Sequence, residues 1–263
     1  MNKQTFLTLL ATFVLLFSFT FSCSAKGKDK AKHVVFIGLD GWGAYSLPKA
    51  DMPNVKKLME DGSYTLKKRS ALPSSSAINW ASMFMGAGPE LHGYTEWGSK
   101  TPELPSRVLN KNGIFPTVFQ LLRDARPEAE IGCLYEWEGI KYLVDTLSLN
   151  YHYHVADCNK TPKELGNMSS SYIKEKHPAL VAICFDGPDH TGHTEGHDTP
   201  AYYEKLKELD SYVGQIVQAV KDAGMLDDTI FILTSDHGGI DKGHGGKTMQ
   251  EMETAFIISG KNI

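Results

Sequence analysis

The sequence predicts a three-layer α/β domain, in which a mostly parallel central sheet carries helices on both faces. Four apolar runs have strand length and many β-branched residues, at positions 33–39, 179–185, 229–234 and 254–259. Runs that are apolar on both faces suit the interior of a parallel sheet. Helical patterns lie between these runs, and the alternation of strand and helix is typical of layered α/β folds.

The helical segments are defined by their ends and by their apolar stripes. Residues 53–61 begin with Pro53 and stop before Gly62, the two residue types that favour helix boundaries at these positions. The clearest helix spans residues 200–223, where apolar side chains recur along one face. Residues 115–124 form a third helical pattern.

Residues 94–165 are less regular and rich in tyrosine and tryptophan. This stretch forms either a small cap over a pocket or ordinary loops whose aromatic side chains pack on the core.

Composition bounds the class of protein. The chain has 263 residues, of which 41% are hydrophobic and 22% charged, and its net charge is −4. These values are typical of one large globular domain with a sizeable core. The mild acidity gives no indication of binding to nucleic acids or anionic membranes, which would favour a basic face, so neither is expected as a partner.

The N-terminus predicts a targeting segment over residues 1–25. Lys3 precedes an apolar run from Phe6 to Phe21, which is shorter than the ~20 residues that span a bilayer. Cleavage after Ala25 is one interpretation, lipidation at Cys23 is a second, and an uncleaved membrane anchor is a third. All three place the protein outside the cytoplasm, in the periplasm or as a cell-surface lipoprotein.

A charged linker at residues 26–32 separates this segment from a single domain at residues 33–263. The domain contains Cys133, Cys158 and Cys184, an odd number, so at most one pair can form. A Cys133–Cys158 bridge would suit an oxidising compartment, whereas Cys184 lies in an apolar run and is expected to be buried.

Polar residues follow three of the predicted strands. Asp40 follows the first, the stretch 186–193 the second, and Asp236 with His237 the third. Sites in open α/β sheets form beyond the carboxyl ends of the strands, so these residues can meet. Asp189 and His193 could share one turn of helix, but Pro188 and Gly192 predict a loop there.

Carboxylate and imidazole ligands suit a divalent transition metal, and zinc is common in hydrolytic sites. The candidates are too many for one tetrahedral ion but suit two ions about 3.5–4 Å apart. Singly, each has a plainer explanation: Asp40 could cap a helix, and residues 236–237 could form a turn. The serines at 74–76 could be helix caps, or could supply a hydroxyl nucleophile acidified by a cation.

Five motifs together carry a resemblance to a known family. They are GLDG at 38–41, NWASMFMGAGPELHG at 79–93, PDHTGH at 188–193, SDHGG at 235–239 and GHGG at 243–246. In this combination the chain resembles the alkaline phosphatase superfamily, and within it the type I phosphodiesterase/nucleotide pyrophosphatase branch. The resemblance extends from about His33 to the end of the chain.

The resemblance implies an alkaline phosphatase-like fold and two divalent ions, expected to be zinc. One ion would be held by Asp40, Ser76, Asp236 and His237, and the other by Asp189, His193 and His244. Ser76 would be the nucleophile, with Ser75 as the alternative. The substrate-binding candidates are Asn79, Lys247 and Trp97, which stands where nucleotide pyrophosphatases have an asparagine.

The activity implied by the resemblance is hydrolysis of small phosphoric esters through a phosphoserine. Three alternatives remain open: a phosphomonoesterase, a sulfatase, and a relative that binds without turnover. Sulfatases of the superfamily carry a CxPxR or SxPxR block, which residues 74–78 lack. Arginine forks suit phosphomonoesters, and no arginine lies within a motif here. Metal-dependent mutases of the superfamily are cytosolic, in contrast to the predicted export.

Overall fold

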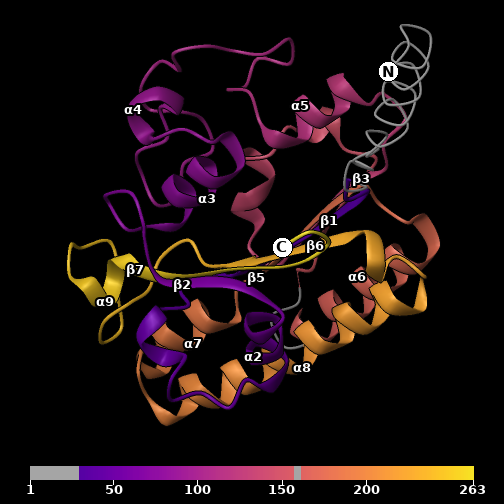
Figure 1. Ribbon diagram of the computed structural model, residues 1–263. Coiled ribbons are helices and arrows are strands. Elements are labelled where there is room, and N and C mark those ends of the chain that lie inside the picture. Colours follow the sequence, from indigo (N-terminus) through magenta and orange to yellow (C-terminus); the bar gives the residue numbers. More distant parts are fainter. Residues whose placement is uncertain (1–29, 157–160) are drawn as a thin grey trace, which may run out of the picture. The chain divides into compact units, whose positions relative to one another are not determined.

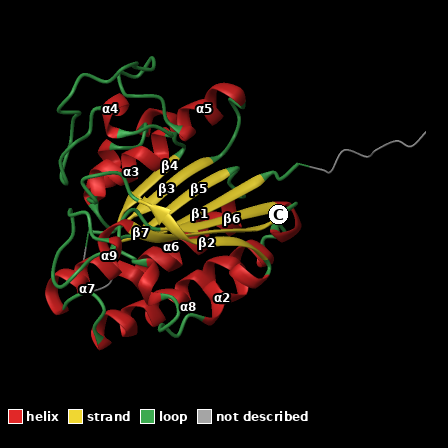
Figure 2. Ribbon diagram, turned by 60° about the vertical axis from the view of Figure 1, so that its left-hand side comes forward, coloured by secondary structure: helices red, strands yellow, loops and turns green. Residues whose placement is uncertain are grey.

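The computed structural model describes residues 30–156 and 161–263. The predicted signal peptide and Cys158 therefore lie outside the described residues. Residues Ala31–Ile263 form one compact unit. In this unit a seven-stranded sheet is covered by helices on both faces (Figures 1 and 2), which confirms the predicted three-layer α/β fold.

The strands follow the order β2-β7-β6-β1-β5-β3-β4. The parallel part comprises β6 (Thr229–Thr234), β1 (His33–Leu39), β5 (Leu180–Phe185), β3 (Ile131–Tyr135) and β4 (Tyr151–His154). At the other side, β7 (Glu253–Gly260) is antiparallel to both β6 and β2 (Gly62–Arg69).

The run at residues 254–259 forms an interior strand of the mostly parallel sheet, as expected, but this strand, β7, is antiparallel to both of its neighbours. The chain returns from β6 through a loop and the short helix α9 (Met249–Met252), without a crossover helix that packs on the sheet. A parallel neighbour needs such a crossover, whereas an antiparallel neighbour can start at the edge where the preceding strand ends.

Helices α2 (Pro53–Glu60), α6 (Thr161–Lys176), α7 (Gly187–Glu195) and α8 (Pro200–Asp222) cover one face of the sheet. Helices α3 (Ser76–Met85), α4 (Pro89–His92) and α5 (Val118–Ala125) lie on the other face (Figure 1). Short 3₁₀ turns occupy Ala44–Ser46, Glu138–Tyr142, Thr146–Ser148 and Leu226–Asp228. The helix expected at 115–124 begins only at Val118, because the Thr117 side chain caps the N–H of Gln120.

The core is divided between the two faces of the sheet. On β5, Val181 and Ile183 pack in the cluster that includes α6 and α8, whereas Ala182 and Cys184 pack in the cluster that includes α3 and α5. This alternation is what a strand buried on both faces requires. Cys184 is buried as predicted, and its thiol and that of Cys133 are free.

The irregular stretch at 94–165 contributes β3 and β4 to the sheet. Tyr94 and Tyr135 from this stretch are buried in the core cluster beside α3 and α5. Among the described residues, none of the helices combines the length and the apolar character needed to cross a bilayer.

The loop predicted around Asp189 is a helix in the structure, α7, which begins at Gly187. Pro188 stands in its first turn, where the missing N–H of proline costs no hydrogen bond. Gly192 lies within the helix because a Cβ there would come within 2.3 Å of the His197 ring. Asp189 and His193, four residues apart, therefore share one helix face.

Candidate functional site

The predicted site residues converge at the carboxyl ends of the central parallel strands. Asp40 follows β1, Asp236 and His237 follow β6, and α7 follows β5. These three strands are neighbours and parallel, so their carboxyl ends meet. Gly41 turns the chain after Asp40 with a φ of +67°, a value that favours glycine, and its N–H donates to Asp236 Oδ1 at 3.2 Å.

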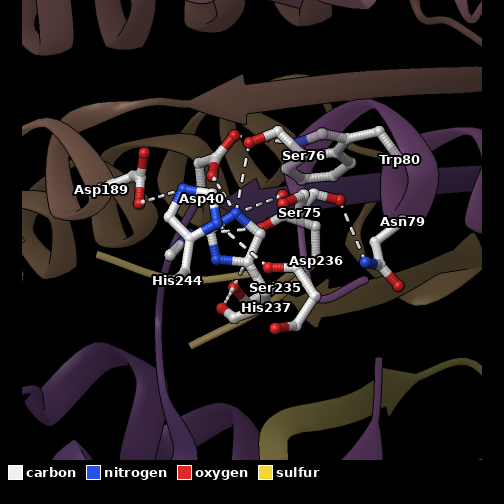
Figure 3. Close-up of polar contacts among 12 residues, drawn as sticks. Asp40, Ser75, Ser76, Asn79, Trp80, Asp189, Ser235, Asp236, His237 and His244 are labelled. Carbon is white, nitrogen blue, oxygen red and sulfur yellow. Dashed lines mark hydrogen bonds and ion pairs between the residues drawn. The ribbon is translucent and has the colours of Figure 1, made fainter. Parts of the chain in front are cut away.

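The first cluster gathers around His237 Nε2 (Figure 3). This nitrogen lies 3.2 Å from Ser76 Oγ, 3.3 Å from Asp236 Oδ2 and 3.5 Å from Asp40 Oδ1. Nδ1 of the same ring donates to the carbonyl of Gly238 at 2.7 Å, so a neutral ring presents a lone pair at Nε2. Ligands of a tetrahedral zinc ion lie about 3.3 Å apart, and the observed spacing fits this value.

Each carboxylate of this cluster accepts hydrogen bonds through only one of its two oxygens. Asp40 Oδ2 accepts from the indole N–H of Trp80 at 2.8 Å, and Asp236 Oδ1 accepts from Gly41. The second oxygens, Asp40 Oδ1 and Asp236 Oδ2, are buried without a hydrogen-bond partner, as is Asp189 Oδ1.

Burial, followed by the neighbouring Asp236 and Asp189, raises the pKa of Asp40 well above its ordinary value. Buried negative charges are costly unless a cation balances them, so the donor set fits a divalent cation.

The second cluster joins Asp189, His193 and His244. His193 Nε2 lies 3.2 Å from Asp189 Oδ2 and 3.2 Å from His244 Nε2, which in turn lies 3.7 Å from Asp189 Oδ1. Both rings bind backbone carbonyls through Nδ1, those of Lys242 at 2.9 Å and Ser74 at 3.0 Å. This orientation is usual for histidine ligands of metals, because it leaves Nε2 free to bind the ion.

Two facing imidazole nitrogens need a cation or a proton between them. The hydrogen bond to Asp189 raises the pKa of His193 to about 9, so a proton is held there when only protein groups surround it. A divalent cation would replace this proton, because metal ligands bind in their deprotonated form.

The two clusters form a single centre. Ligand atoms of Asp40, Asp189 and His237 lie within 4.8 Å of one another, although these residues were assigned to different ions. The rings of His237 and His244 stack with their centroids 3.8 Å apart. The structure thus brings all seven predicted ligands together.

Ser76 is the first residue of α3, and Ser75 is the N-cap. The Ser76 hydroxyl faces His237, whereas the carbonyl of Ser75 accepts from the Asn79 side chain at 3.0 Å. The same amide binds the backbone of Ala71 in both directions, through Oδ1 at 2.7 Å and Nδ2 at 3.2 Å. Asn79 is buried, and its side chain therefore fixes the shape of residues 71–76, here named the serine loop.

The other two substrate-binding candidates lie on segments that adjoin the serine loop. Trp97 is 67% exposed, and its carbonyl accepts from the N–H of Ala77 at 3.2 Å, beside Ser76. Lys247 is exposed and follows Gly246, whose carbonyl accepts from the Ser74 hydroxyl at 2.7 Å.

The roles of three further residues in the site were not predicted from the sequence. Ser74 ties the serine loop to the His244 loop, since its hydroxyl also accepts from Gly245 at 3.2 Å. Trp80 anchors Asp40, and its position four residues after Ser76 on the same helix was the available signal. Lys68 lies on β2, which the sequence did not predict; its ammonium group contacts the carbonyl of Ser235, and burial lowers its pKa to about 8.

Removing the indole N–H of Trp80 tests whether the orientation of Asp40 matters. Trp80→Phe keeps a buried aromatic ring but leaves Asp40 Oδ2 without its donor. We expect the free energy of unfolding to fall by about 1–3 kcal/mol. We also expect a fall of roughly 10- to 100-fold in metal affinity. Thermal unfolding and competition with a chelator measure the two effects. Unchanged metal affinity in a folded Trp80→Phe protein would contradict this role.

Comparison with known proteins identifies the family of this chain. The model of the type I phosphodiesterase / nucleotide pyrophosphatase family matches residues 34–254. Bis(5'-adenosyl)-triphosphatase enpp4 of Mus musculus is 25% identical over 222 residues, which cover 80% of this chain and 48% of that protein. The chain thus spans about half the length of this relative.

Solved structures share the fold. Murine ectonucleotide pyrophosphatase/phosphodiesterase 5, as an inactive variant in complex with AMP, superposes with a TM-score of 0.61 at 19% identity, over 80% of this chain and 57% of the other. A 2-O GAG sulfatase gives a TM-score of 0.68 at 13% identity, over 89% and 65%. The chain belongs to the type I phosphodiesterase / nucleotide pyrophosphatase family, as its motifs predicted.

Proposed function

We propose that this protein hydrolyses small phosphoric esters, as a phosphodiesterase or nucleotide pyrophosphatase, with two zinc ions and a covalent phosphoserine at Ser76. One ion would be held by Asp40, Ser76, Asp236 and His237. The other would be held by Asp189, His193 and His244. The family membership supports the class of reaction, and the geometry of the site supports the roles of the residues.

One observation carries the proposal. Three buried carboxylate oxygens without hydrogen-bond partners and three imidazoles bound through Nδ1 to carbonyls face a common space beside one serine hydroxyl. A donor set of oxygen and nitrogen with unpaired negative charge suits zinc. Without a cation, burial of these unpaired oxygens is costly, because the proton on His193 offsets only part of the negative charge.

The reaction would proceed in two displacements. Bound divalent cations would lower the pKa of a hydroxyl or water and offset charge on the phosphate oxygens. Ser76 Oγ attacks phosphorus, the new Ser76–phosphorus ester forms, and the bond to the leaving alcohol or phosphate breaks with transfer of a proton to that group. Water then attacks the phosphoserine, restores the hydroxyl of Ser76 and releases the phosphoryl product.

The supporting residues have distinct tasks in this scheme. Asn79 would hold the serine loop in place rather than contact the substrate, because its amide is bonded to the backbone. Trp97 and Lys247 are exposed beside the loop and would contact the leaving group and the anionic phosphate respectively. The AMP complex of the murine relative supports a small nucleotide-like substrate.

A paired assay tests the proposed function. We expect hydrolysis of bis-(p-nitrophenyl) phosphate to exceed that of p-nitrophenyl phosphate and of p-nitrophenyl sulfate. Chelation should abolish the activity, because the acidified hydroxyl depends on the cations, and zinc should restore it. Preference for the monoester would support a phosphomonoesterase, and preference for the sulfate would support a sulfatase. Binding without turnover of any of the three esters would indicate a non-catalytic relative.

A further inference from the structure

His197 is a buried histidine beside the metal centre that none of the assignments above uses. It follows α7, and its side chain has no exposed surface. Neither ring nitrogen has a hydrogen-bond partner. An imidazole carries at least one N–H in either protonation state, so at least one buried donor is unsatisfied, which is a costly arrangement.

Two glycines hold the His197 ring in place. A Cβ at Gly192, on α7, would come within 2.3 Å of the His197 Nε2 atom, and a Cβ at Gly239, after β6, within 2.2 Å. The backbone reinforces this position, since the N–H of His197 donates to the carbonyl of Asp241 at 2.6 Å. The ring therefore lies between the segment that carries Asp189 and the segment that follows His237.

The clamped ring points toward an unpaired carboxylate oxygen. His197 Nε2 lies 3.9 Å from Asp189 Oδ1, which is itself buried and without a partner. A shift of about 1 Å would bring the two atoms to the ~2.9 Å of a normal hydrogen bond. A carboxylate oxygen has two lone pairs and can bind a cation while it accepts such a bond.

We propose that His197 is a positioning residue, whose Nε2–H donates to Asp189 Oδ1 and fixes that carboxylate for the cation shared with His193 and His244. This inference rests on the proposed two-cation site. It gives a partner to Nε2 and to Asp189 Oδ1, which are otherwise unpaired, and it accounts for the glycines at positions 192 and 239 around the ring. The bond would orient Asp189 in the way that hydrogen-bonded partners usually orient metal ligands.

The competing explanation is that the ring only fills space between the two segments. His197→Phe distinguishes this explanation from the proposed hydrogen bond, because it keeps an aromatic ring but removes both nitrogens. We expect the metal-free variant to unfold at or above the wild-type temperature, since an unsatisfied donor is removed. We expect zinc affinity of the Asp189 site to fall roughly 10- to 100-fold, measured by competition with a chelator.

Two further variants identify the nitrogen and guard against overpacking by phenylalanine. The amide nitrogen of His197→Gln falls near the place of Nε2, so this variant should keep zinc affinity within a few-fold of wild type. The amide of His197→Asn mimics Nδ1 instead, and we expect it to behave like phenylalanine. His152→Phe, at an exposed position on the edge strand β4, is the matched control and should bind zinc as wild type does.

The outcomes separate the inference from the function on which it rests. Suppose that wild type binds two zinc ions tightly and that folded His197→Phe binds them with equal affinity. This result would overturn the role of His197 but leave the proposed function intact. Equal loss in the glutamine and phenylalanine variants would also overturn it, because the Nε2 donor would not be what matters. Wild type without zinc affinity would overturn both.

Discussion

Ser76→Ala should lower kcat for a phosphodiester by about 1,000-fold or more, because the hydroxyl that forms the covalent intermediate is gone. Zinc content should stay at two ions, since Asp40, Asp236 and His237 would still surround the first ion. The measurement pairs steady-state kinetics with metal analysis. Rapid quenching of the wild-type reaction should also trap phosphate on Ser76, and the alanine variant should trap none.

Ser75→Ala is the matched control for this experiment. Ser75 is the N-cap of α3 but its side chain makes no capping hydrogen bond, so the fold should tolerate the change. Its activity should stay within a few-fold of wild type. Full activity of Ser76→Ala, or abolished activity of Ser75→Ala, would move the nucleophile to the neighbouring serine or remove it from the mechanism.

Asp189→Asn should lower both the activity of the protein and the stability of its metal-free form. The change removes one of three predicted ligands of the second ion, so we expect one zinc per chain instead of two and a fall in kcat of about 1,000-fold. It also removes the ion pair between His193 Nε2 and Asp189 Oδ2 at 3.2 Å, which lowers the pKa of Asp189 against the effect of burial and raises that of His193 to about 9. Near neutral pH the fold stabilises the charged form of both groups, so the metal-free variant should unfold at a lower temperature than metal-free wild type.

Asp198→Asn provides the control for a lost carboxylate near the same helix. Asp198 is exposed and pairs with Lys49 at 2.8 Å, an ion pair expected to contribute less than about 1 kcal/mol. This variant should keep two zinc ions and wild-type kinetics. If Asp189→Asn also kept two tightly bound ions and full activity, the second cation site would have to lie elsewhere.

The parts of the fold that sequence patterns predicted are those with strong local signals. The runs at 33–39 and 229–234 coincide with β1 and β6, because fully apolar strands flanked by polar turns are distinctive. Strand β2, GSYTLKKR, was missed because it lies at the edge of the sheet and is mostly polar and exposed. Whether β2 and β7 pair parallel or antiparallel with their neighbours depends on the route of the connecting chain, which short-range sequence patterns do not encode.

In the site, too, local sequence signals predicted some features, whereas features that depend on tertiary contacts were missed. Residue types and glycines predicted the members of the cluster, since aspartates and histidines that follow adjacent strands must meet at one edge. The helical state of α7 was missed because Pro188 and Gly192 both disfavour a helix interior. Pro188 stands in the first turn, and the contact with the His197 ring accounts for the glycine at position 192. The role of Asn79 was also hidden, because its partners Ala71 and Ser75 are backbone groups.

Locating the metal ions in a zinc-loaded crystal by anomalous diffraction tests the central claim most directly. Two anomalous peaks about 3.5–4 Å apart are expected. One should lie among Asp40, Ser76, Asp236 and His237, and the other among Asp189, His193 and His244, with ligand distances of about 2.0–2.2 Å. A zinc-saturated crystal with neither peak at the carboxyl ends of β1, β5 and β6 would contradict the account.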